Sequence, residues 1–176
     1  EKMSTPPMGH RSEEATARVR IGPALIRIAS STRFKLAELA RPYLELLSQA
    51  TGETVDLSIL DQSKLVFIDQ IQGTHRLQAV SAIGVSFPLH CTGNGKAVLA
   101  ALDPKEYARL ESRIELVPHT EKTITSWPSL DVEIERVRDT GMAYDREEHS
   151  LGICAVACAV RGPLGELAAI SVPTPT

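Results

Sequence analysis

The stretch TVDLSILDQSKLVFIDQI, residues 54–71, is where the hydrophobic pattern of this sequence takes the period of a β-strand. Its first part alternates Val55, Leu57 and Ile59 with polar residues, as a half-buried strand does. Its second part, KLVFIDQI, follows the polar residues 61–63, which suit a turn. We expect the two parts to form an antiparallel hairpin, because so short a connection cannot join parallel strands.

A helical spacing of apolar residues precedes this hairpin. It is present over residues 19–31 and again in FKLAELARPYLELLSQATG, residues 34–52, where Gly52 suits a helix end. Pro42 lies inside the second segment and has no amide hydrogen to donate. We therefore expect the helix to kink or restart at Pro42.

Strands and helices form separate groups after the hairpin. We expect a third strand at THRLQAVS (74–81), a helix over about 94–102, a second helix starting at Asp103 and a third ending at Gly141. The tail contains a long apolar strand, a Gly-Pro-Leu-Gly turn and a returning strand. Because hairpins rather than alternating helices connect the strands, the sequence predicts an α+β fold with antiparallel pairing.

Composition and charge exclude several classes of protein. The chain has 176 residues, of which 43% are hydrophobic, enough for one packed domain. Its 19 Lys and Arg against 22 Asp and Glu leave no cationic excess for binding nucleic acid. No apolar run approaches the roughly 20 residues that span a bilayer, and the polar start lacks a signal-peptide centre. We expect a cytoplasmic domain with reduced thiols that does not itself bind DNA.

The motif FPLHCTGNGKAVLAAL, residues 87–102, combines two glycines, a histidine and a cysteine before an apolar run. A Walker phosphate loop is excluded, because His90 replaces its first glycine and Ala97 its hydroxyl residue. A dinucleotide fingerprint is excluded, because Val98 replaces the third glycine. A glycine-rich turn at a helix start still presents free amides to a carboxylate, although an ordinary helix cap would look the same.

The cysteines and histidines predict neither catalysis nor a metal site. In an extended segment the side chains of His90 and Cys91 would point to opposite faces, which argues against a nucleophile and its base. Cys154 and Cys158, with His149 nearby, would lie on one strand about 13 Å apart, too far to share an ion. We therefore expect no metal and no cofactor.

An acidic segment, residues 145–149, precedes the apolar strand of the tail. Such a cluster is usually a solvated loop. Glu147 and Glu148 nevertheless fall between two strands, where functional loops concentrate. Both interpretations remain open at this point.

Three motifs taken in order, FPLHCTGNGKAVLAAL, GMAYDREEHSLGICAVACAV and AAISVPTP, resemble the effector-binding domain of the IclR family of bacterial transcriptional regulators. RIGPALIRIA resembles the junction after the wing of that family's winged helix-turn-helix. The resemblance covers about residues 19–176. It implies a GAF-like (profilin-like) fold, in which a curved antiparallel sheet with flanking helices has a small-molecule pocket on one side.

The resemblance also implies effector-binding roles for eight residues. These are the amides of Gly93 and Asn94, the polar contacts Asp145 and Ser171, and the wall positions Arg76, Ala79, Phe87 and Ala155. The sequence departs from the family where Arg76 replaces an apolar residue and Pro173 replaces a serine. Because a buried guanidinium needs a partner, we expect Arg76 to pair with Asp145 or with an acidic ligand.

The leading hypothesis is the regulatory part of a longer, DNA-binding protein. Residues 1–31 would be an arm and linker-helix remnant without a DNA-binding winged helix, and residues 32–176 the effector-binding domain. We expect a carboxylate or aromatic acid as effector, a homodimer or homotetramer, and DNA contact through the missing N-terminal domain. The alternative is a small enzyme that uses Cys91 or Asp145 on the same scaffold.

Overall fold

A computed structural model describes residues 23–79 and 81–176, with side chains from residue 35 onward. The elements are α1 (Pro23–Thr51), β1 (Val55–Asp61), β2 (Lys64–Ile71), β3 (Ser86–Phe87), α2 (Gly93–Ala101), α3 (Pro104–Glu111), α4 (Trp127–Thr140), β4 (Ala143–Arg146), β5 (Ile153–Arg161) and β6 (Leu167–Pro175). The arm expected over residues 1–18 lies outside the described residues. The apolar pattern of 19–31 lies outside the described side chains.

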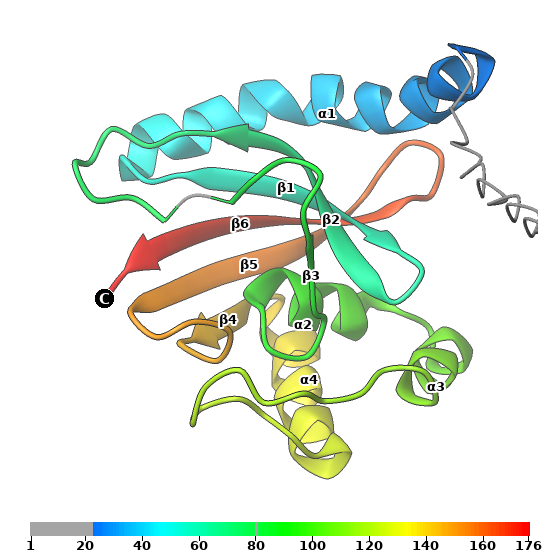
Figure 1. Cartoon of the computed structure of the whole chain (residues 1–176), viewed down its shortest axis with the longest axis vertical. Helices are drawn as coiled ribbons and strands as arrows, with labels where there is room; N and C mark the ends of the chain where they lie inside the picture. The colour runs from blue at the N-terminus through cyan, green and yellow to red at the C-terminus, as the bar shows by residue number, and fades with distance from the viewer. Residues whose placement is uncertain (1–22, 80) are drawn as a thin grey trace, which may run out of the picture.

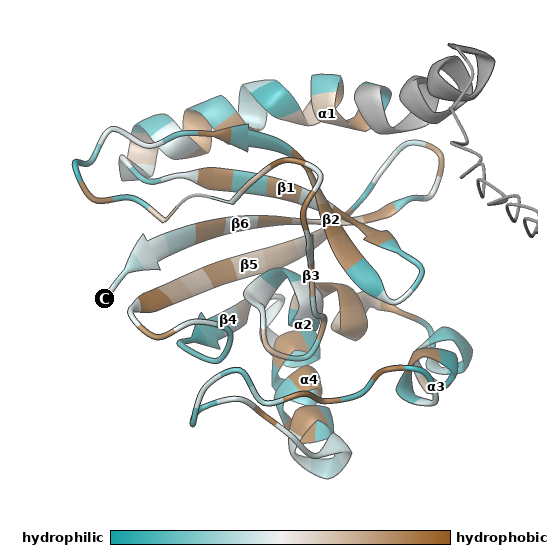
Figure 2. Cartoon of the chain, viewed as in Figure 1, coloured by the Kyte–Doolittle hydropathy of each residue, from teal (hydrophilic) through white to brown (hydrophobic). Residues whose placement is uncertain are grey.

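The strands form one antiparallel sheet in the order β3-β2-β1-β6-β5-β4, so the predicted α+β fold is confirmed. α1 lies across one face of the sheet, and α2 and α4 lie on the other (Figure 1). Leu44 of α1 packs with Leu57 of β1, whereas Leu99 of α2 packs with Leu130 of α4 and Ala169 of β6. Hydrophobic residues accordingly concentrate along the strands (Figure 2).

α1 is one continuous helix with Pro42 inside it, so the expected restart at Pro42 is wrong. Pro42 is exposed, which allows water to satisfy the carbonyl that its ring leaves unpaired. The helix also runs through residues 31 and 32, where we placed a domain boundary. Gly52 ends it with φ 74°, as predicted. None of the described helices is both long and apolar enough to cross a membrane.

The predicted hairpin is confirmed, since β1 pairs with β2 from Val55–Ile71 to Asp61–Lys64. The third strand expected at 74–81 is wrong, because β2 pairs on its other side only with β3 among the described residues. Side-chain hydrogen bonds instead hold Ser81 in the segment between β2 and β3. Gln70 Nε2 donates to the Ser81 carbonyl at 2.7 Å, and Ser81 Oγ donates to Asp56 at 2.8 Å. These contacts replace a backbone ladder.

The remaining elements follow local signals in the sequence. The Thr92 hydroxyl accepts a hydrogen bond from the Gly95 amide and caps α2, and Asp103 caps α3 in the same way. α4 ends at Gly141, which has φ 74°. β5 and β6 form the predicted C-terminal hairpin along their whole length. The predicted cap at Asp103 and the predicted stop at Gly141 therefore located the start of α3 and the end of α4 correctly.

Candidate functional site

A cavity of about 220 Å³ lies on the face of the sheet that carries α2. Strand pairing places Asp56 of β1 opposite Ser171 of β6, and Ala155 of β5 opposite Pro173 of β6. Ser171 and Pro173 are two residues apart, so they point to the same face of the strand. These four residues form the floor of the cavity.

The start of α2 borders this cavity through Gly93 and Asn94. Their amides have no intrahelical acceptor and lie at the positive end of the helix dipole. The Asn94 side chain donates to Ser58 Oγ at 3.0 Å, which ties α2 to β1. A Cβ at Gly93 would lie 3.3 Å from the Ala157 methyl, so the helix begins close against the sheet. This geometry suits a carboxylate held by backbone amides.

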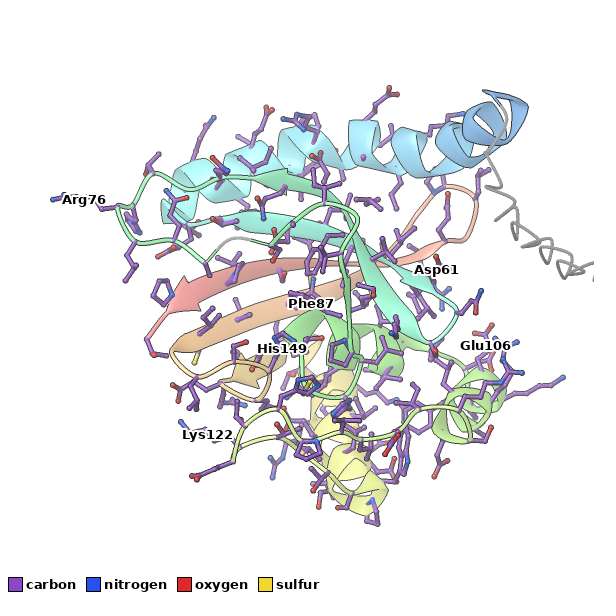
Figure 3. All side chains as sticks on the ribbon, in the orientation of Figure 1. Asp61, Arg76, Phe87, Glu106, Lys122 and His149 are labelled. Carbon is purple, nitrogen blue, oxygen red and sulfur yellow. The ribbon has the colours of Figure 1, made fainter. Side chains whose placement is uncertain are left out.

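Aromatic rings form one side of the cavity. Phe87 packs edge-on against Phe67, with 4.9 Å between ring centroids, and lies 4.6 Å from the ring of His149. Figure 3 shows Phe87 and His149 next to each other. Ala79 and Ser81 of the irregular segment complete this side. An aromatic or aliphatic body of a ligand would contact these rings.

Two buried carboxyl groups face the same space. Asp56 accepts hydrogen bonds from Gln70 Nε2 at 2.7 Å and from Ser81 Oγ at 2.8 Å. Asp145 accepts the Glu148 amide at 2.8 Å. Desolvation by burial raises the pKa of Asp56, and it raises the pKa of Asp145 to about 6. No lysine or arginine is among the described residues that line this cavity.

Seven of the eight predicted site residues meet here: Ala79, Phe87, Gly93, Asn94, Asp145, Ala155 and Ser171. Arg76 does not, and its expected pairing with Asp145 is wrong. It is exposed and projects away from Phe87 and His149 (Figure 3). The reason is that residues 74–79 leave the sheet, and outside it a guanidinium stays hydrated at no cost.

Sequence reasoning missed several lining residues, namely Asp56, Phe67, Ser81, Thr92, His149, Ser150 and Ile153. Asp56 carried a usable signal, because it is polar and alternates with apolar residues in a strand that is central to the sheet. That this polar face is buried, rather than solvated as in many antiparallel sheets, is seen only in the structure. Ser81 carried none, since its position depends on contacts distant in sequence.

Residues 28–176 match the family described as "Bacterial transcriptional regulator IclR C-terminal". The chain belongs to the IclR family. The HTH-type transcriptional regulator Rv1719 of Mycobacterium tuberculosis is 48% identical over 165 residues, which cover 93% of this chain and 63% of that protein. The transcriptional repressor IclR of Escherichia coli is 36% identical over 143 residues, which cover 80% and 52%. The chain thus spans less than two thirds of either relative.

Solved structures of transcriptional regulators confirm the GAF-like α+β fold. The IclR protein of Thermotoga maritima has a TM-score of 0.78 and 32% identity, covering 88% of this chain and 64% of that one. A double mutant of the inducer-binding domain of the PobR transcription factor from Acinetobacter, in complex with 3-hydroxybenzoic acid, has a TM-score of 0.70 and 27% identity, covering 80% of this chain and 83% of that one. The relatives named here are transcriptional regulators rather than enzymes.

Proposed function

We propose that this chain is the ligand-sensing domain of a bacterial IclR-family transcriptional regulator and binds a small carboxylic acid in the cavity described above. The observation that carries the proposal is the meeting of three segments, 79–94, the loop after β4, and strands β5 and β6, around the start of α2. The volume of about 220 Å³ lies below the roughly 300 to 1,000 Å³ of sites for drug-sized molecules. The effector is therefore smaller than a drug-sized molecule.

The chemistry of the lining supports an aromatic or short aliphatic acid. The carboxylate would accept hydrogen bonds from the amides of Gly93 and Asn94, and the apolar body would contact Phe87. Ser171 is placed to bind a hydroxyl group. The 3-hydroxybenzoic acid in the PobR complex belongs to this chemical class.

Calorimetry with matched ligands tests this proposal. Benzoate or 3-hydroxybenzoate should bind at least about tenfold more tightly than the corresponding amide, because charge-assisted hydrogen bonds contribute about 1.5 to 3 kcal/mol. Arg76→Ala is the matched control and should leave both affinities unchanged, since Arg76 lies outside the cavity. Equal affinity for acid and amide would contradict the amide-held carboxylate.

The affinity for such an acid should fall as the pH rises from 5.5 to 7.5. Asp145 is mostly neutral below its pKa of about 6 and charged above it, where it repels an anion. The ligand stays ionised over this range. We expect a difference of about fivefold, on the order of 1 kcal/mol.

Asp145→Asn should remove most of this pH dependence. The other charged groups that act on Asp145 are Glu148 and Lys96, which pair with each other. His149 also lies beside it, and burial lowers the pKa of His149. Asp56 faces the same cavity. An unchanged pH profile in Asp145→Asn would contradict the role of Asp145 and leave the effect to Asp56 or His149, which line the same cavity.

The enzyme alternative is not favoured by the surroundings of Cys91. Burial, followed by the charges of Asp145 and Glu148, raises the pKa of its thiol to about 12. A nucleophilic cysteine needs a thiolate near neutral pH. Turnover of an acid from the ligand panel by the purified chain would restore this alternative.

In the full-length regulator, we propose that effector binding changes the arrangement of subunits and thereby DNA binding by an attached N-terminal domain in the cytoplasm. The ligand can do so only by binding one arrangement more tightly than another. Leu39, Tyr43 and Leu46 form an exposed apolar stripe on α1 that suits a symmetric contact. A homodimer or homotetramer in light scattering supports this, and a monomer at high concentration contradicts it.

A further inference from the structure

Three side chains outside the effector cavity form a compact cluster. His90 and Cys91 belong to the turn that leads into α2, and His119 belongs to the connection between α3 and α4. One donor atom from each lies within 4.8 Å of the other two. His90 and Cys91 are buried, whereas His119 is exposed.

The conformation of the turn explains why His90 and Cys91 converge. We expected neighbouring side chains to point apart, as they do in an extended chain. Residues 89–92 instead form consecutive bends that lead into the helix. The thiol and an imidazole nitrogen therefore reach the same place, and the expectation is wrong for this pair.

His90 provides an independent sign of a ligand. His90 is only 1% exposed, and its Nε2 is 3.0 Å from the carbonyl oxygen of Val117. A carbonyl only accepts, so Nε2 carries the hydrogen and Nδ1 presents a lone pair. Nδ1 is buried and has no hydrogen-bond partner among the described residues. Such a nitrogen is costly to bury unless something binds it.

We propose that His90, Cys91 and His119 bind a zinc ion. Imidazole nitrogen and thiolate sulfur are the donors that zinc takes in proteins, whereas magnesium and calcium require oxygen. The carbonyl that holds His90 Nε2 fits the usual outer contact of a metal-binding histidine. Neighbouring ligand atoms of tetrahedral zinc lie about 3.3 to 3.8 Å apart, so a shift of about 1 Å in side-chain positions closes the site.

A second cavity gives the ion a route to this cluster. It has a volume of about 520 Å³ and is lined by His90 and His119, so water can occupy the fourth coordination position from this side. Phe87 and His149 line both this cavity and the effector cavity. The bound ion would hold the α3–α4 connection against the turn before α2, with the thiol proton of Cys91 released to solvent.

The test uses the whole chain after removal of metal with a chelator. Calorimetry should show one zinc ion bound per chain, and zinc should raise the melting temperature. Cobalt(II) in place of zinc should give a thiolate-to-cobalt charge-transfer band. His119→Ala should weaken zinc binding at least about tenfold, and the exposed position of His119 makes loss of folding an inadequate explanation.

Two matched variants separate the cluster from other thiols and imidazoles. Cys91→Ser should abolish the cobalt band, whereas Cys158→Ser should keep it. His75→Ala, which removes an exposed imidazole next to Glu53, should bind zinc as the unmodified chain does. Absence of one-to-one zinc binding, or a cobalt band that persists in Cys91→Ser, would overturn the proposal.

Discussion

Replacing Lys96 with methionine is expected to lower the free energy of unfolding by about 3 to 5 kcal/mol. The Lys96 side chain is fully buried on α2, donates to Glu148 at 2.6 Å and lies 3.5 Å from Glu133 of α4. Methionine keeps most of the apolar stem but removes the cation. The carboxylate of Glu148 is itself buried, so it would lose the cation that compensates its charge.

Urea unfolding of Lys96→Met and Lys105→Met measures this effect. Lys105 is exposed on α3, and its replacement should change stability by no more than about 0.5 kcal/mol. Adding Glu148→Gln to Lys96→Met should restore part of the loss, because it removes the uncompensated charge. Equal stability of the two lysine variants would show that the buried pair does not hold α2 in place.

Gly95→Ala is expected to destabilise the protein by about 3 kcal/mol or more, although alanine normally favours a helix by about 1 kcal/mol over glycine. A Cβ at this position would lie 2.1 Å from the carbonyl oxygen of Leu89 and 2.4 Å from its Cα. Backbone atoms cannot rotate away as a flexible side chain can. The start of α2 would have to move, and the hydrogen bond from the Gly95 amide to Thr92 would be lost.

Gly93→Ala is the control for this substitution, because Gly93 lies in the same helical turn. Its added Cβ would meet the Ala157 methyl at 3.3 Å, so we expect a loss below about 1 kcal/mol. Thermal or urea unfolding compares the two variants. If Gly95→Ala is as stable as Gly93→Ala, the backbone at Leu89 can move away from the added Cβ at little cost in free energy.

The sequence predicted those elements that depend on neighbouring residues. The hairpin of β1 and β2, the cap at Asp103 and the stop at Gly141 are all short-range signals, and the structure contains each of them. The half-buried pattern expected for β1 is wrong, because residues 55–59 are buried on both faces. The prediction of a third strand was wrong because that segment depends on residues distant in the sequence. Ser81 forms hydrogen bonds with Asp56 and Gln70, and the residues next to Ser81 in the sequence do not predict these contacts.

The error at Arg76 follows from that missing strand. The family resemblance implied a pocket-wall position for Arg76, whereas the segment around it leaves the sheet. The other seven site residues, which the resemblance implied in the same way, lie in segments that do border the cavity. The contact chemistry of the cavity, and in particular the meeting of the Asp56 and Asp145 carboxyl groups, needed the structure.

The sequence by itself determined the fold class, the hairpins, the helix ends and the membership of the family, because periodicity, caps and motifs are properties of adjacent residues. Only the tertiary structure decided that Lys96 is buried and paired with Glu148, 52 residues away, and that His119 joins His90 and Cys91. Lysine is ordinarily a surface residue, and histidine is of intermediate burial. Their charge and donor atoms acquire a role only when packing removes water and brings a distant partner within reach.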